Sequence, residues 1–94
     1  MITDLIKFKI KEGCAEEAAA LIRGAMQDDL GDEGCLLAKA FLSKTEANLI
    51  YVLLGWENRE SIDKHLKTDH DRLFIKNLDP LLDGPHEFVA WEPL

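Results

Sequence analysis

The chain has 94 residues, a length typical of one domain, so residues 1–94 are treated as a single unit. Its net charge of -7 would be repelled by nucleic-acid backbones and anionic membrane surfaces, so neither is expected as a partner. There is no apolar run of about 18 residues and no basic N-terminal segment leading into one, so no membrane span or signal peptide is predicted. Cys14 and Cys35 lack CxxC spacing and suit free thiols in the cytoplasm.

The first half of the chain predicts a strand, a helix and two more strands. The first strand alternates in polarity, with Ile2, Ile6 and Phe8 on one face. The helix has apolar residues at helical spacing and two glutamates in its first turn, which suit a helix N-terminus. The predicted bounds are Ile2–Ile10 for the strand, Cys14–Leu30 for the helix, and Cys35–Ser43 and Leu49–Trp56 for the next two strands.

The second half predicts two helical stretches and a final strand. Asn58 can cap a helix over Arg59–Thr68, whose buried side would carry Ile62 and Leu66. A second helical stretch is expected at His70–Leu82, with Leu73, Phe74 and Leu78 pointing inward. A final strand is expected at His86–Leu94 and is ended by Pro93. The order β-α-β-β-α-(α)-β predicts an α+β protomer with the ferredoxin-like split βαβ pattern.

The third strand is apolar on both faces. Tyr51 and Leu53 lie on one face, and they are as apolar as Val52 and Leu54 on the other. The predicted helices suffice to cover one face of the sheet, and a second copy of the sheet is the economical cover for the other. We therefore expect a homodimer with sheet-to-sheet contact, in which Tyr51 lies at the interface.

Three stretches resemble one known family, the antibiotic biosynthesis monooxygenase-like domains. That family shows a Gly-Cys-Leu turn into a strand, then a Trp that ends the next strand, a His nine residues later, and Thr-x-His. The matching stretches are Glu33–Phe41, Gly55–His70 and Leu78–Pro85, and the matching residues are Gly34, Cys35, Leu36, Trp56, His65, Thr68 and His70. The resemblance implies a dimeric α+β barrel and, for its oxygenase members, chemistry without flavin, haem or metal.

Branches of this family differ in how well they match the chain. The haem-degrading branch uses an Asn, a Trp and a His at positions that here hold Ile6, His65 and Ile75, so haem degradation is disfavoured. The quinol and anthrone oxygenase branch resembles the chain around Gly55–Leu66. The branch that handles a phosphorylated autoinducer dione resembles it around Leu78–Pro85. Both remain open.

His65 and His70 are candidate metal ligands. Five residues apart on one continuous helix, their side chains would point about 140° apart, whereas zinc-binding helices place ligands three or four residues apart. A break near Asp69 could bring them together, but no cysteine or carboxylate spacing completes a ligand set. Nucleotide-binding glycine motifs and a serine elbow are absent too. We therefore expect no metal and no cofactor.

The remaining chemistry is acid–base chemistry in an apolar pocket. If the second helix packs on the sheet, Trp56 and His65 line one cavity, and a partly desolvated imidazole there can have a pKa near neutrality. We expect His65 to be the catalytic proton acceptor, with Trp56, His70 and Phe74 in the substrate pocket. Structural roles compete with each of these: core filling by Trp56, a half-buried structural His65, and a solvent-exposed His70. His86 is expected at the surface.

The leading functional hypothesis is a cofactor-independent monooxygenase acting on a quinol-like or polyketide-like aromatic. An isomerase of a small dicarbonyl or hydroxyketone, phosphorylated or not, would use the same proton transfer. A non-catalytic or stress-related dimer that holds a small apolar molecule is the third hypothesis.

Overall fold

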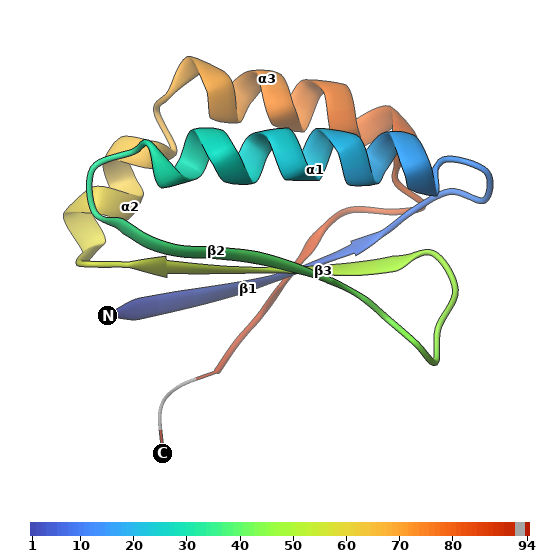
Figure 1. Cartoon of the computed structure of the whole chain (residues 1–94), viewed down its shortest axis with the longest axis horizontal. Coiled ribbons are helices and arrows are strands. Elements are labelled where there is room, and N and C mark those ends of the chain that lie inside the picture. Colours follow the sequence, from blue (N-terminus) through green and yellow to red (C-terminus); the bar gives the residue numbers. More distant parts are fainter. Residues whose placement is uncertain (92–93) are drawn as a thin grey trace.

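The computed structural model describes residues 1–91 and residue 94 and shows one sheet with helices on one of its faces (Figure 1). The predicted α+β, ferredoxin-like order of elements is confirmed. The elements are β1 Ile2–Lys9, α1 Ala15–Leu30, β2 Cys35–Leu42, β3 Leu49–Trp56, α2 Arg59–His65, α3 Asp69–Leu78, the 3₁₀ turn η1 Asp79–Leu81 and β4 Glu87–Val89.

The sheet has the strand order β2-β3-β1-β4, and each neighbouring pair is antiparallel. Ile6 faces Val52 across the central pair, and Phe41 faces Tyr51 across the pair of β2 and β3. A bulge between Cys35 and Leu37 shifts the register where β2 begins. The two inner strands, β1 and β3, are therefore paired on both of their edges.

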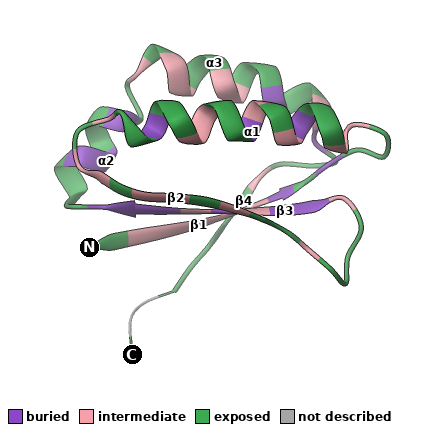
Figure 2. Ribbon diagram, viewed as in Figure 1, coloured by how far each residue is buried: buried purple, intermediate pink, exposed green. Residues whose placement is uncertain are grey.

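The core lies between the sheet and the helix layer, where buried residues from both gather (Figure 2). Alternate residues of β3 point to the helices, and Trp56 at its end is 0% exposed. The remaining fully buried large side chains are Phe8, Ile10, Ile22 and Leu78. Within the described part of the chain, none of the helices is both long enough and apolar enough to cross a membrane.

The second half of the chain departs from prediction at its helix ends. The helix predicted as Arg59–Thr68 ends at His65, and Thr68 caps a new helix that begins at Asp69. Leu66, predicted to be buried, follows the end of α2 and is 51% exposed. Leu73 is 57% exposed, because the inward stripe of α3 runs through Phe74 and Leu78 instead. The last strand is shorter than predicted, and its predicted end at Pro93 lies outside the described residues.

In the part of the chain that the structure describes, no helix covers the opposite face of the sheet (Figure 1). Tyr51 and Leu53 of β3 are half-buried there. Phe41 on β2 is 50% exposed on this face. Trp91 is also 50% exposed, and its indole nitrogen donates a hydrogen bond to the Thr3 hydroxyl at 3.1 Å. The two-sided apolar pattern therefore leaves an apolar surface on a single protomer.

Candidate functional site

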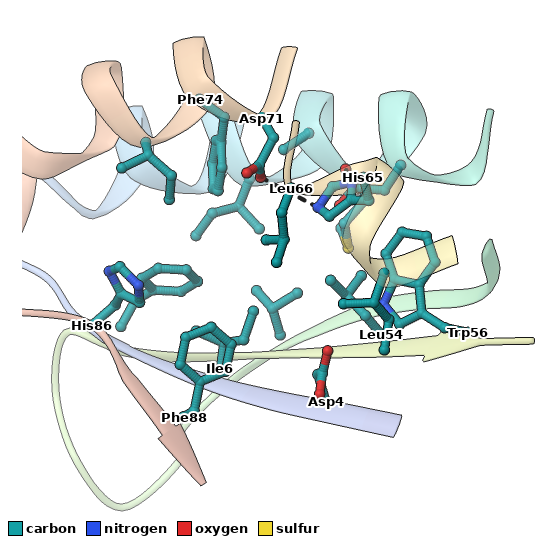
Figure 3. A pocket seen from close by; sticks show the side chains of 18 residues that line it. Asp4, Ile6, Leu54, Trp56, His65, Leu66, Asp71, Phe74, His86 and Phe88 are labelled. Atoms are coloured by element: carbon teal, nitrogen blue, oxygen red, sulfur yellow. Dashed lines mark ion pairs between the residues drawn. The ribbon is translucent and has the colours of Figure 1, made fainter. Parts of the chain in front are cut away.

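A cavity of about 320 Å³ lies between the sheet and the helix layer (Figure 3). This volume is at the small end of the range for ligand pockets, which begins near 300 Å³. Most lining side chains are aliphatic or aromatic. The titratable residues that line it are Asp4, Asp29, His65, Asp71 and His86. The site is thus an apolar chamber with a few polar groups on its walls.

Three of the four predicted site residues line this cavity. Trp56 and His65 contact each other, with ring centroids 4.7 Å apart and planes inclined by 40°. Phe74 of α3 packs edge-on against Phe8 of β1, with centroids 6.3 Å apart. His70 is not among the lining residues. Its ring lies beside that of His65, with a centroid distance of 5.8 Å.

Both ring nitrogens of His65 face carboxylates. Nδ1 lies 2.8 Å from Asp32 Oδ2 and 3.7 Å from Asp29 Oδ1, and Nε2 lies 3.3 Å from Asp71 Oδ1. Burial alone would lower the pKa of His65, but the hydrogen bonds to Asp71 and Asp32 and the charge of Asp29 outweigh it and raise the pKa to about 9. The expected near-neutral pKa is therefore wrong, because that expectation placed no carboxylates around the ring.

The end of α2 explains how His65 and His70 meet. The Thr68 hydroxyl donates a hydrogen bond to the His65 carbonyl at 2.7 Å and accepts one from the Asp71 backbone N–H at 3.3 Å. One side chain thus ends the first helix and caps the second. Because the helix is not continuous, the 140° separation does not apply, and both imidazoles reach Asp32, His70 through Nε2 at 2.8 Å.

Asp29 and Asp32 respond differently to the same two histidines. Burial raises the pKa of Asp29 to about 6, against the attraction of His65 and His70. Burial also acts on Asp32, but hydrogen bonds from both imidazoles lower its pKa below the ordinary value. Asp32 therefore serves as the anionic bridge between the rings, and Asp29 is the more strongly desolvated carboxylate behind it.

Gly34 lets the turn that carries Asp32 approach α2 closely. Its φ of +82° is in the left-handed region that favours glycine. A Cβ at this position would clash with the side chain of Ser61 in α2. The Gly34 carbonyl also accepts a hydrogen bond from the Glu57 N–H at 2.8 Å. The turn is therefore held against the start of the helix that ends in His65.

Sequence reasoning missed several polar residues of the site, although three of them carried a signal. Asp4 alternates with Ile6 on the inward face of β1. Asp29 continues the helical stripe of Ile22 and Met26, and Asp71 begins the stripe of Phe74, Ile75 and Leu78. Asp32 lies in a turn, where no periodicity indicates a direction. His86, expected at the surface, lines the cavity 5.8 Å from the Phe8 ring.

Comparison with known proteins gives both a family and a fold. A family model described as antibiotic biosynthesis monooxygenase matches residues 1–77. A crystal structure of an antibiotic biosynthesis monooxygenase has a TM-score of 0.90 at 16% identity, covering 100% of this chain and 99% of the other. No curated protein matches the sequence.

Two further solved structures are similar. A conserved protein from Methanosarcina mazei has a TM-score of 0.87 at 22% identity, covering 93% of this chain and 86% of that one. A protein of unknown function from Bacteroides thetaiotaomicron, described as a possible oxidoreductase, has a TM-score of 0.84 at 21% identity, covering 95% of each chain. At these identities the similarity shows the fold, while the residues of the site have to indicate the chemistry.

Proposed function

Because the chain belongs to the antibiotic biosynthesis monooxygenase family, we propose that it is a cofactor-independent monooxygenase of a quinol-like or polyketide-like aromatic. The observation that carries the proposal is the apolar cavity in which His65 is the strongest base on the wall. Aromatic rings of Trp56, Phe8 and Phe74 line the same space and suit a flat aromatic substrate.

The proposed reaction begins with removal of a hydroxyl proton from the substrate. A phenolic hydroxyl has a pKa of about 10, so the neutral form of His65, whose pKa is about 9, takes its proton with little thermodynamic cost. Because His65 is mostly protonated at pH 7, it must first lose its own proton to solvent, and kcat should rise with pH up to about 9. We assign this role to Nε2 of His65, the nitrogen on the side of Asp71. Substrate binding then has to displace the 3.3 Å contact between Nε2 and Asp71.

The substrate anion would then react with O2. In the net reaction a quinol and O2 give a hydroxyquinone and water: one oxygen atom enters the ring, and the other leaves with two hydrogens from the substrate. The substrate supplies all the electrons, so the balance requires no further reductant. The apolar walls support this step, because they keep bulk water away from the reactive anion.

We propose further that the functional unit is a homodimer in the cytoplasm. Phe41, Tyr51, Leu53 and Trp91 form an apolar surface on the face of the sheet without helices, and a second copy of that face would cover it. Among the described residues, Lys7 and Glu87 form a charge pair at 3.9 Å where β1 meets β4. The two free thiols support a reducing compartment.

An isomerase is the second candidate function, and Asp4 favours it. Asp4 enters the cavity from the sheet, whereas His65 and Asp71 enter from the helix layer (Figure 3). A proton can be moved between two carbons of a dicarbonyl compound by one base, or by two groups on different sides of the substrate. Asp4 and His65 could remove the proton and return it, with no consumption of O2.

Oxygen uptake by the chelator-treated protein tests both functions on a panel of quinols and enolisable ketones. We expect O2 consumption with a quinol, and His65→Gln should lower kcat by roughly 10²- to 10⁴-fold with a small change in KM. Trp56→Phe should mainly raise KM, because it reshapes a wall of the cavity. Asp69→Asn, at an exposed position one turn from the site, is the matched control.

Three results on the same panel would contradict the proposal. Turnover without O2 uptake would replace the monooxygenase by the isomerase. Unchanged kcat in a folded His65→Gln variant would remove His65 from the chemistry. Tight binding of aromatic compounds without turnover of any member would indicate a binding protein.

A further inference from the structure

Four side chains, two of which line the cavity, form a compact group of metal-ligating type. Asp29 comes from the last turn of α1, Asp32 from the following turn, His65 from the end of α2 and His70 from the first turn of α3. One potential ligand atom from each lies within 4.8 Å of all the others. These four residues thus place two imidazole nitrogens and two carboxylate oxygens close together.

The spacing of these atoms is close to the spacing that a small metal ion requires. With bonds of about 2.0–2.2 Å, the ligand atoms of a tetrahedral ion lie roughly 3.3 Å apart. His65 Nδ1 lies 2.8 Å from Asp32 Oδ2 and 3.7 Å from Asp29 Oδ1, while His70 meets Asp32 and Asp29 through different nitrogens, at 2.8 and 3.9 Å. With one atom from each residue, all four lie within 4.8 Å of one another, so binding one ion requires the group to contract by up to about 1.5 Å.

Asp29 supplies a second, independent observation. Its residue is 7% exposed, yet its nearest imidazole contacts, at 3.7 and 3.9 Å, are longer than hydrogen bonds. The Asp29 side chain accepts no hydrogen bond from the described residues, although it points into the group. Asp29 thus has two ion-pair contacts with imidazoles but no hydrogen bond among the described residues, and a cation at the centre of the group would bind its carboxylate directly.

Asp71 completes the arrangement from outside. Its Oδ1 faces Nε2 of His65, the nitrogen opposite the one that points at the group, at 3.3 Å. Metal-bound histidines commonly donate their second N–H to a carboxylate in this way, which fixes the ring and its tautomer. The side chains of Asp32 and His70 are partly exposed, so an ion can enter from solvent on that side.

We propose that Asp29, Asp32, His65 and His70 bind one divalent transition-metal ion, with Zn²⁺ as the representative of the class. Mixed imidazole and carboxylate ligands favour such ions over Mg²⁺ and Ca²⁺, which prefer oxygen ligands alone. The site goes beyond the proposed function and opposes it. A metal on Nδ1 leaves a proton on Nε2, so the loaded protein lacks the proton acceptor.

Calorimetric titration of the chelator-stripped, dialysed full chain with Zn²⁺ tests the site without substrate. We expect one ion per chain, with Mg²⁺ bound at least roughly 100-fold more weakly. Asp32→Asn and His70→Gln should each weaken Zn²⁺ binding by roughly 100-fold or more, and Asp71→Asn by about 10- to 100-fold. Asp28→Asn and Asp69→Asn, at exposed neighbouring positions, should bind as wild type does. Co²⁺ should give the visible absorption of a four-coordinate ion.

Three results would overturn the metal site. One is the absence of Zn²⁺ binding to wild type, which would leave a network of ion pairs. Another is undiminished binding by folded Asp32→Asn or His70→Gln, and the third is equal affinity for Mg²⁺. Circular dichroism checks each fold, and if one variant unfolds, the other decides. Because turnover is measured with chelator and Zn²⁺ binding without substrate, either proposal can fail while the other stands.

Discussion

The two faces of the sheet carry similar side chains in different surroundings. On the face toward the helices, Val52, Leu54 and Trp56 are at most 5% exposed and border the cavity. On the other face, Phe41 and Trp91 are each 50% exposed. Aromatic residues on one face are therefore buried within the protomer, while those on the other face remain exposed and available for contact with a second chain.

We therefore expect residues on the helix face to determine the stability of the protomer and residues on the open face to determine its association. Substitutions on the helix face remove contacts within the protomer, so they should change its free energy of unfolding. Substitutions on the open face should leave the protomer intact and change assembly. The site also belongs to the helix face, and its function and stability are therefore coupled there.

The largest expected effect is that of Trp56→Ala. The ring is 0% exposed, so its removal leaves a cavity and should lower the free energy of unfolding by about 3–5 kcal/mol. Phe41→Ala on the open face, where half of the ring is already exposed, should cost under about 1 kcal/mol in a monomeric state. Chemical denaturation at low protein concentration measures both. Equal losses would abolish the distinction between the faces.

The second effect is a dependence of stability on pH that arises on the helix face. The pKa of His65 rises from 6.5 to about 9 on folding, so its stabilising contribution is complete below pH 6.5 and is lost as pH rises through 9. We expect the free energy of unfolding to fall by about 3 kcal/mol over that window in chelator. In His65→Gln the fall should disappear. A fall of equal size in that variant would assign the effect to another group.

Leu53→Arg is the matching experiment on the open face. The new charge would lie beside Lys39 across β2 and would be buried without a partner in a sheet-to-sheet dimer. We expect the dimer dissociation constant to rise at least roughly 10-fold, while the protomer stays folded. Sedimentation analysis measures this, with Glu12→Arg at an exposed position as control. A wild-type monomer, or an unweakened dimer in the variant, would refute association through this face.

The smallest expected effect is that of Leu73→Ser on α3, and Leu78→Ala on the same helix serves as its reference. Leu73 is 57% exposed and Leu78 is 0% exposed. Leu73→Ser should change the free energy of unfolding by at most about 0.5 kcal/mol, whereas Leu78→Ala should cost about 2–5 kcal/mol. Thermal and chemical unfolding provide the comparison. A large loss from Leu73→Ser would mean that this surface is covered in the assembled protein.

Most of the fold could be predicted because it follows from periodicity. The alternation of Ile6 and Phe8 and the spacing of Ile22 and Met26 indicate a strand and a helix without tertiary information. The helix end at His65 could not be predicted in this way, because apolar spacing continues to Leu66. The deciding interaction is the Thr68 hydroxyl, which competes with the helix for the His65 carbonyl.

The site was less predictable for the same reason. Trp56, His65 and Phe74 were predicted from spacing and from the family resemblance, and all three line the cavity. Asp71 is only six residues from His65, but the other two carboxylates that raise its pKa, Asp29 and Asp32, come from a distant segment. Asp32 is 33 residues from His65 and lies in a turn, so their contact exists through the tertiary fold alone.

Thr68 also provides a way to recognise this site in other chains. Its hydroxyl holds the backbone of His65 on one side and of Asp71 on the other. The positions of the imidazole and of the carboxylate that faces it therefore depend on one oxygen atom. A relative that keeps both aspartates and both histidines but has valine at this position should lose the register between the two helices. The spacing D-x2-D followed by H-x2-T-x-H-D is therefore a search pattern for chains that carry the whole cluster, and a single codon change at Thr68 is a short evolutionary route to losing it.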